Sequence, residues 1–257
     1  MIQFIDTHAH LYDEAFDGDF AEVIGKIKND GVVKCIFPAI DSTTFERQVN
    51  AARQCGDFVC QAMGLHPTSV GTNWKEELDF VKEKVGQGSY VAIGEIGLDG
   101  YWSREFMEQQ KEVFREQLIL AYRLGLPVII HVREATEETF QVIDSLGDEI
   151  PSGVFHAFSG SVETWERIRR YGKFMVGIGG VVTYKNAGVA KTVEQIPLEY
   201  ILLETDCPYL TPVPHRGKRN DSGNLVYIAE KIAQIKGCTL EEVAAVTTAN
   251  AKRMFGL

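Results

Sequence analysis

Short, nearly continuous apolar runs recur along the chain, and an amphipathic stretch follows most of them. Several runs are rich in β-branched residues, which is typical of strands that are buried on both faces. The eight runs predicted to be strands are Gln3–Thr7, Val33–Ala39, Val59–Gly64, Tyr90–Glu95, Pro127–His131, Gly153–His156, Phe174–Ile178 and Tyr200–Asp206.

The stretches between these runs carry apolar residues at helical spacing. The longest is Glu105–Leu124, where Phe106, Val113 and Leu118 fall on one stripe and Gly125 ends the pattern. The predicted helices are Asp19–Asp30, Ser42–Gln54, Glu105–Leu124, Glu134–Leu146, Val162–Tyr171, Asn224–Lys236 and Leu240–Arg253.

Eight strands alternating with helices over 257 residues predict a (β/α)₈ TIM-like barrel. No linker divides the chain, so we expect a single domain over residues 1–257. The rival fold is an open doubly wound sheet. A nucleotide-binding version of that fold would carry G-x-G-x-x-G after an early strand, and the sequence has no such motif there.

The composition limits which partners the protein is expected to bind and which cellular compartment it is expected to occupy. A net charge of −10 argues against broad adhesion to nucleic acid or to anionic membranes, although a local basic site remains compatible with it. The five scattered cysteines and the absence of a leader or a long apolar segment predict a soluble, cytoplasmic protein. We expect no membrane association and no obligate protein partner.

Polar residues gather where the predicted strands end, which is where the active site of a barrel lies. His8 and His10 are two residues apart, so in an extended chain their side chains share a face. The candidate metal ligands at the strand ends are His8, His10, Glu95, His131, His156 and Asp206. This mixed set of nitrogen and oxygen donors suits Zn²⁺ or Mn²⁺. Six ligands exceed one tetrahedral ion, so we expect two ions about 3.5–4 Å apart, with Glu95 as the bridge.

Several further motifs stand out in the chain. They are His8-Ala9-His10, Gly64-Leu65-His66-Pro67, Ile93-Gly94-Glu95-Ile96-Gly97-Leu98-Asp99, Ile130-His131, Phe155-His156-Ala157-Phe158-Ser159-Gly160, Gly179-Gly180 with Lys185-Asn186-Ala187, Leu203-Glu204-Thr205-Asp206 and Arg216-Gly217-Lys218-Arg219-Asn220. Together these motifs resemble the TatD family of metal-dependent deoxyribonucleases, in the amidohydrolase superfamily. The resemblance implies a TIM-like barrel, the six ligands above, and phosphodiester hydrolysis with Mg²⁺ or Zn²⁺, often as a 3′→5′ exonuclease. The sequence departs from the family pattern at Gly100, where a bulkier residue is expected, and at Asp221-Ser222-Gly223.

Roles can be assigned to the residues around this ligand set. Asp206 is expected to take the proton from the attacking water. Glu204 shares its face and is either a proton relay or a buried acid that anchors a neighbouring strand. Cys207 points to the other face and is not counted as a ligand. The residues expected to bind the phosphates of DNA, or of RNA, are His66, Arg133, Arg216, Lys218 and Arg219. Tyr101 and Trp102 could stack on a base, but we expect them to pack within their loop.

Three functions compete at this stage. The first is a metal-dependent DNase. The second is a small-molecule amidohydrolase or esterase on the same barrel, such as a lactonase or an aminoacyl-ester deacylase. The third is a metal-binding barrel without activity. The basic residues at 215–219 favour the first over the second, because a neutral ester needs no cluster of cations. The intact ligand set argues against the third.

Overall fold

The computed structural model describes residues 2–257 and confirms the alternation of strands and helices. Its parallel strands follow one another in chain order within one eight-stranded sheet. They are β1 (Phe4–Asp6), β2 (Val32–Phe37), β3 (Val59–Met63), β4 (Ala92–Asp99), β5 (Val128–Arg133), β6 (Gly153–Phe155), β7 (Phe174–Ile178) and β8 (Ile201–Leu203). The helices are α1 (Phe20–Asn29), α2 (Phe45–Cys55), α3 (Trp74–Gln87), α4 (Met107–Leu124), α5 (Thr136–Asp144), α6 (Val162–Arg170), α7 (Val189–Gln195), α8 (Leu225–Lys236) and α9 (Leu240–Phe255).

The chain forms two compact units. The first unit comprises residues 1–37, 51–60 and 156–257, and the second comprises residues 38–50 and 61–155. The assignment of residues 1–257 to a single domain stays a prediction. The first unit holds both ends of the strand order, since β1 pairs with β2 and β7 pairs with β8. The backbone amide of Thr7 donates to the carbonyl of Leu203 at 3.1 Å, which joins the end of β1 to β8.

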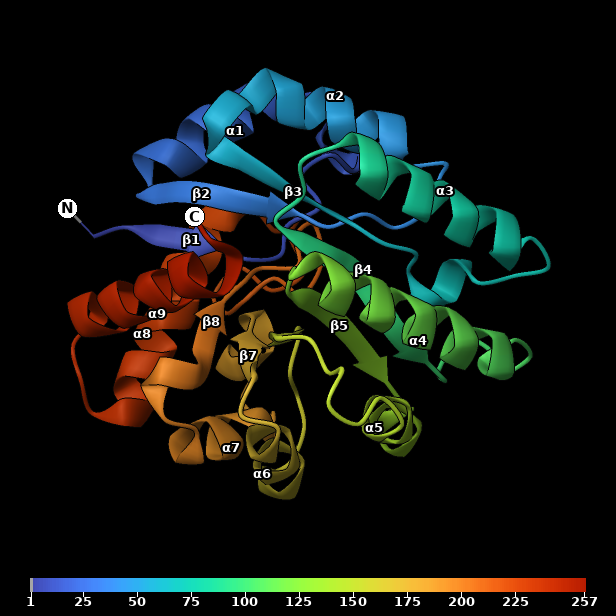
Figure 1. Cartoon of the computed structure of the whole chain (residues 1–257). Helices are drawn as coiled ribbons and strands as arrows, with labels where there is room; N and C mark the ends of the chain where they lie inside the picture. The colour runs from blue at the N-terminus through green and yellow to red at the C-terminus, as the bar shows by residue number, and fades with distance from the viewer. Residues whose placement is uncertain (1) are drawn as a thin grey trace. The chain divides into compact units, whose positions relative to one another are not determined.

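The C-terminal helices α8 and α9 pack in the first unit, and α9 lies beside β1 (Figure 1). Polar side chains of α9 tie it to the strands. The Thr248 hydroxyl donates to the carbonyl of Gln3, and the Asn250 amide donates to the carbonyls of Leu198 and Ile201. Helix α9 therefore supports the strand that leads to the first predicted ligands, His8 and His10.

In the second unit β4 pairs with β3 and β5 (Figure 1), and all eight residues of β4 are buried. The predicted end of this strand at Glu95 is wrong, because β4 continues to Asp99. The register with β5 shifts between Ile93 and Ile96, so Glu95 lies at an irregularity within the strand. In the sequence alone, an acidic residue after an apolar run looks the same whether the strand ends there or continues.

Helix α4 holds the ends of two strands in place through buried glutamines. Gln110 accepts a hydrogen bond from the amide of Asp99 at 2.9 Å and donates to its carbonyl at 3.2 Å. Gln117 does the same for Leu65, at 2.8 and 3.2 Å. The helix stops as predicted at Gly125, whose φ of 66° lies in the left-handed region that glycine adopts without strain.

Two helices were not predicted. Helix α3 buries only Leu78 and Val81, so its apolar stripe is thin. Helix α7 has only seven residues, which is too short for a periodic pattern.

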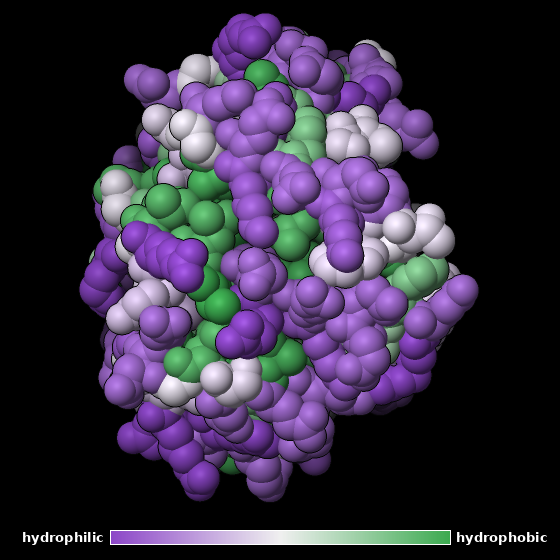
Figure 2. Space-filling view, turned by 45° about the vertical axis from the view of Figure 1, so that its right-hand side comes forward, coloured by the Kyte–Doolittle hydropathy of each residue, from purple (hydrophilic) through white to green (hydrophobic). Residues whose placement is uncertain are grey.

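Hydrophilic side chains cover most of the face seen in Figure 2, with hydrophobic atoms showing between them. Within residues 2–257, no helix combines the length and the apolarity needed to cross a membrane.

Candidate metal centre

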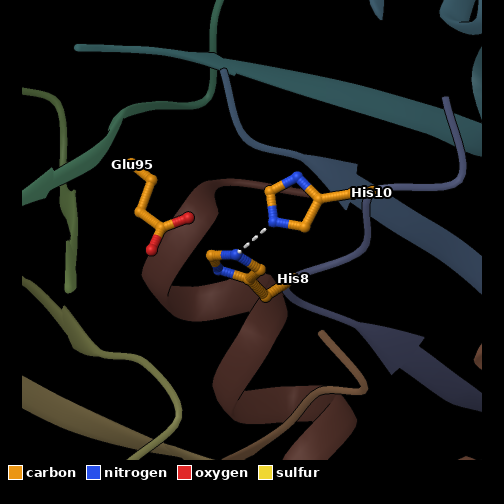
Figure 3. Close-up of side chains that lie close together, drawn as sticks. All are labelled: His8, His10 and Glu95. Atoms are coloured by element: carbon orange, nitrogen blue, oxygen red, sulfur yellow. Dashed lines mark hydrogen bonds between the residues drawn. The ribbon is translucent and has the colours of Figure 1, made fainter. Parts of the chain in front are cut away.

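The first unit brings His8, His10 and Asp206 together just beyond β1 and β8. His8 Nε2 lies 3.0 Å from His10 Nε2 (Figure 3). Asp206 Oδ1 lies 3.6 Å from His8 Nε2 and 3.4 Å from His10 Nε2. Two ring nitrogens and a carboxylate oxygen therefore face one point. This is the arrangement that a divalent cation stabilises in a buried site.

Charge and hydrogen bonding favour the ionised form of Asp206. Burial alone would raise the pKa of this carboxyl. The hydrogen bond with His10 and the nearby His8 and His156 outweigh burial and lower the pKa. Its backbone φ of 54° lies in the left-handed region, where aspartate is among the few residues tolerated. Its amide donates to the carbonyl of His8 at 2.9 Å, which fixes the turn against β1.

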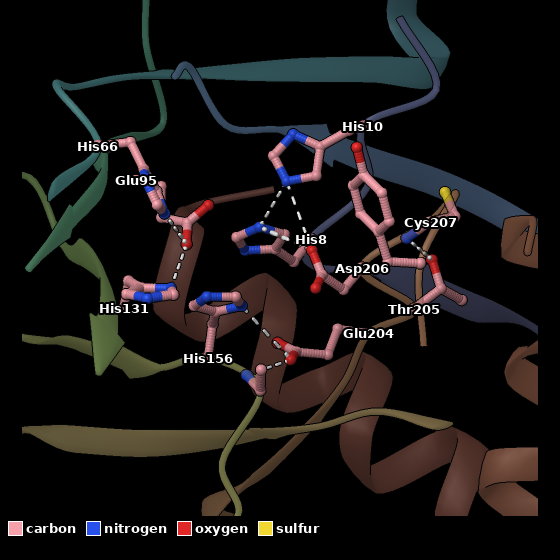
Figure 4. A network of polar contacts seen from close by, with 12 residues as sticks. His8, His10, His66, Glu95, His131, His156, Glu204, Thr205, Asp206 and Cys207 are labelled. Atoms are coloured by element: carbon pink, nitrogen blue, oxygen red, sulfur yellow. Dashed lines mark hydrogen bonds and ion pairs between the residues drawn. The ribbon is translucent and has the colours of Figure 1, made fainter. Parts of the chain in front are cut away.

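His156 and Glu204 extend this group. The His8 and His156 rings stack with centroids 3.9 Å apart, and His156 Nδ1 lies 3.7 Å from Glu204 Oε1 (Figure 4). Glu204 is fully buried and accepts a hydrogen bond from the amide of Ala157. Among residues 2–257, its Oε2 atom has no hydrogen-bond partner. A buried carboxylate oxygen without a partner is costly, and a cation would relieve that cost.

The second unit assembles Glu95, His131 and His66 (Figure 4). Glu95 Oε1 lies 3.0 Å from His131 Nδ1 and 3.2 Å from His66 Nε2. The other nitrogen of His131, Nε2, lies 2.9 Å from Asp99 Oδ2. A carboxylate on one ring nitrogen fixes the tautomer and leaves the other nitrogen for a metal. The phenol of Tyr12 lies 2.9 Å from His10 Nδ1 in the first unit and can do the same there.

Each unit thus offers three ligand atoms that lie within 4.8 Å of one another. They are supplied by His8, His156 and Glu204 in the first unit, and by His66, Glu95 and His131 in the second. All six side chains are buried or nearly so. Neutral imidazoles with carboxylates are the donors that Zn²⁺ and Mn²⁺ accept, so the residues present fit a divalent metal.

Sequence reasoning missed the role of two acids. Asp99 holds His131, and Asp6 accepts hydrogen bonds from the amides of His8 and Thr205 and from the Thr205 hydroxyl. Burial raises the pKa of Asp6 from 3.8 to about 7, against the lowering effect of hydrogen bonds from Ser222 and Thr205. The available signal was spacing, because Asp6 ends β1 and precedes His8 by two residues.

The basic residues expected to bind phosphate differ in the groups that they contact. Arg219 pairs with Asp19, donates to the carbonyl of Ala15 and lies over the Phe16 ring. Arg216 lies over the Tyr184 ring at 4.3 Å. Lys218 is exposed. His66 lies beside Glu95 rather than at the surface.

Arg133 lies over Tyr101, at 3.6 Å from the ring centroid. The expectation that Tyr101 and Trp102 pack within their loop is wrong for Trp102, which is 71% exposed.

This combination of a barrel and buried histidine–carboxylate groups is the arrangement expected of a metal-dependent hydrolase. A family model described as TatD related DNase matches residues 5–256. The chain therefore belongs to the TatD related DNase family.

Individual relatives agree with this assignment. The chain is 42% identical over 251 residues to the uncharacterized metal-dependent hydrolase YabD of Bacillus subtilis, covering 97% of this chain and 98% of that one. It is 33% identical over 265 residues to the human deoxyribonuclease TATDN3, covering 98% and 94% of the two chains. The crystal structure of YJJV, a TatD homologue from Escherichia coli, aligns with a TM-score of 0.90 at 30% identity over 99% and 98% of the two chains. The predicted barrel and the predicted family are both confirmed.

Proposed function

We propose that the protein is a DNase that hydrolyses phosphodiester bonds with two divalent metal ions, Mg²⁺, Zn²⁺ or Mn²⁺. The observation that carries the proposal is the convergence of His8 Nε2, His10 Nε2 and Asp206 Oδ1 within 3.6 Å of one another. The name of the human relative, deoxyribonuclease TATDN3, supports DNA as the substrate.

We assign the metal ions to His8, His10, Glu95, His131, His156 and Asp206. Glu95 would hold a metal ion through its carboxylate, together with His131 in the same unit. His66 and Glu204 complete the three-ligand groups described above and are further candidates. Bound divalent ions supply a Lewis acid that acidifies water and neutralises charge on phosphoryl oxygens.

In this proposal, side chains of the protein accept the proton of the attacking water and bind the phosphate. Asp206 Oδ1 faces His8 and His10, so we assign Oδ2 as the atom that accepts the proton of the attacking water. Glu204 holds the turn at Ala157 and lies beside His156, so it is a positioning residue in this proposal.

Substrate contacts are assigned to His66, Arg133, Arg216, Lys218 and Arg219. Arg216 and Lys218 are the strongest choices, since neither is held by an ion pair among those described for residues 2–257. Arg219 would exchange part of its pairing with Asp19 for phosphate. A 3′→5′ direction of cleavage and a cytoplasmic location stay predictions.

The test is digestion of single-stranded and double-stranded DNA with added Mg²⁺, together with metal analysis of the purified protein. Asp206→Asn, purified in parallel, controls for contaminating nucleases. Cleavage of DNA by the wild type but not by the Asp206→Asn variant supports the proposal. Turnover of a neutral lactone or aminoacyl ester without cleavage of DNA would replace it with the small-molecule hydrolase.

A further inference from the structure

Two aromatic side chains stand exposed where β4 ends. Tyr101 is 48% exposed and Trp102 is 71% exposed, whereas Trp165 is fully buried. The two exposed rings meet edge to face, with centroids 5.0 Å apart. Two exposed aromatic rings in contact form a local apolar patch, which is the kind of surface that binding sites present.

A cation completes this surface. The Arg133 guanidinium, at the end of β5, lies 3.6 Å from the Tyr101 ring centroid and 5.6 Å from that of Trp102. Stacking orients the guanidinium plane and leaves its N–H groups at the edge for an anion. An aromatic face beside an oriented cation matches a nucleotide, which pairs a flat base with a phosphate.

The backbone of this loop is fixed by the carboxylate of Asp99. Asp99 Oδ1 accepts hydrogen bonds from the amides of Tyr101 at 2.9 Å and Trp102 at 3.2 Å, and Oδ2 lies 2.9 Å from His131 Nε2. One side chain therefore positions both the aromatic rings and a candidate metal ligand. The exposed rings lie beside the candidate centre of their own unit.

Gly100 explains why the loop can take this path. A Cβ at Gly100 would lie 2.6 Å from the carbonyl oxygen of Glu134 and 2.6 Å from Arg104 Nη1. The amide of Gly100 donates to the carbonyl of Arg133 at 2.7 Å, which holds the loop against the end of β5. Glycine at this position, where the family pattern has a bulkier residue, lets the loop approach the end of β5 closely. This approach places the rings beside Arg133.

We propose that Tyr101, Trp102 and Arg133 form a platform that stacks an unpaired base of single-stranded DNA and binds the phosphate next to it. The inference rests on the proposed DNase function and adds a strand preference to it. Bases in a duplex are already stacked on one another, so only an unpaired or frayed base can lie on these rings.

Tryptophan fluorescence of the metal-loaded enzyme tests binding without cleavage. The probe is a phosphorothioate oligothymidylate of about ten nucleotides, within the usual site size of a single-strand binder, compared with an abasic strand of the same length and with a blunt duplex. We expect quenching by the oligothymidylate and much weaker quenching by the other two, and we expect Trp102→Ala to abolish the difference. Equal quenching by the abasic strand, or quenching that persists in Trp102→Ala, overturns the platform.

Cleavage kinetics give the second readout. Stacking on one base is worth roughly a 5- to 150-fold change in affinity. We expect the ratio of KM values for the abasic strand and for unmodified oligothymidylate to fall by about that factor in Trp102→Ala, with Trp102→Phe retaining most of it. Tyr122→Ala removes a 42% exposed aromatic ring on α4 and should keep the wild-type ratio.

The platform and the DNase function can fail separately. Cleavage of abasic and base-containing strands with equal KM overturns the platform and leaves the DNase standing. Base-dependent quenching without cleavage retains the platform and removes the DNase. A wild type that neither binds nor cleaves single-stranded DNA removes both.

Discussion

Glu204 and Gly177 lie so close that a Cβ on Gly177 would come within 1.9 Å of Glu204 Oε2. The buried carboxylate thus fills the space that any side chain on this residue of β7 would need. Gly177→Ala should lower the free energy of unfolding by about 1–3 kcal/mol, as overpacking does, and should reduce kcat by displacing Glu204 from Ala157. Urea denaturation and kcat measured on the same preparation check both effects.

Gly179→Ala is the matched control for that variant. A Cβ there would lie 3.6 Å from its nearest neighbour, the carbonyl oxygen of Glu204, which is an ordinary contact. Equal loss of stability in the two variants would show that the Glu204 contact is not the cause.

The assignment of Asp206 as the proton acceptor is tested by Asp206→Asn, which keeps the size of the side chain and removes its charge. Turnover should fall by about 10²–10⁴, the usual effect of losing a positioned acid–base group. Elemental analysis must accompany the rates, because the variant also changes a proposed metal ligand. Near-normal turnover in a variant that still holds metal would move the role elsewhere, and Glu204→Gln would be the next variant to measure.

His131→Ala removes a proposed nitrogen ligand that Asp99 holds in place. We expect lower metal occupancy by elemental analysis with only a modest change in stability, because the stability of a barrel lies in its strand core. His215→Ala is the control. This histidine bonds to the Tyr227 hydroxyl and is not among the proposed ligands, so its variant should keep the wild-type metal content. Equal metal content in both variants contradicts the role of His131.

Arg216→Ala addresses the phosphate binding. The KM for DNA should rise, and the slope of log affinity against log salt should flatten by about one unit for each phosphate that the variant no longer neutralises. Arg219→Ala breaks the pairing with Asp19 as well, so its effect mixes binding with local stability. A salt series on a short oligonucleotide and on a neutral ester separates the two substrate classes. An Arg216→Ala variant that loses ester turnover but keeps its DNA salt slope would argue for the small-molecule hydrolase.

The carboxyl of Asp41, in the turn before α2, should make the free energy of unfolding depend on pH. Burial by itself would raise its pKa, but hydrogen bonds from the Thr43 and Ser69 hydroxyls and from the Thr44 and Thr43 amides outweigh burial and lower the pKa. A carboxyl whose pKa is lower in the folded state stabilises above its unfolded value, about 3.9, and loses this effect as pH falls through the folded value.

Asp41→Ala should therefore cost about 1–2 kcal/mol at pH 7, and the cost should shrink in acid. Urea denaturation at pH 7 and near pH 3 measures this difference. Asp79→Ala, on the exposed face of α3, provides the control at both pH values. A cost of Asp41→Ala that stays constant with pH would assign the effect to lost packing rather than to charge.

The strands could be predicted because burial on both faces forces apolar runs, and a polar residue at the end of such a run stands out. His8, His131, His156 and Asp206 were chosen as candidate ligands in this way, and their role as ligands stays a prediction. Asp99 was missed because β4 was predicted to end at Glu95, and the irregularity that carries the strand onward depends on its pairing with β5. Register is a property of two strands and leaves little trace in either one alone.

Surface features were harder to predict. The local sequence around Trp102 does not distinguish a packed ring from an exposed one, since that depends on the path set by Gly100 and Asp99. The pairing of Arg219 with Asp19 likewise joins residues 200 positions apart. Such pairings depend on how the chain folds and cannot be predicted from the sequence around either residue.

The hydrogen bond from Thr7 to Leu203 spans 196 positions of the chain and lies beside the His8, His10 and Asp206 group. On the ribosome, the first histidines emerge long before Asp206 is made, and β1 must wait for β8 before that group can close. A nascent chain therefore carries these two candidate ligands without their carboxylate partner. If the group binds metal as proposed, we expect loading after translation, and synthesis in a chelated medium should yield a folded chain that accepts its ions later.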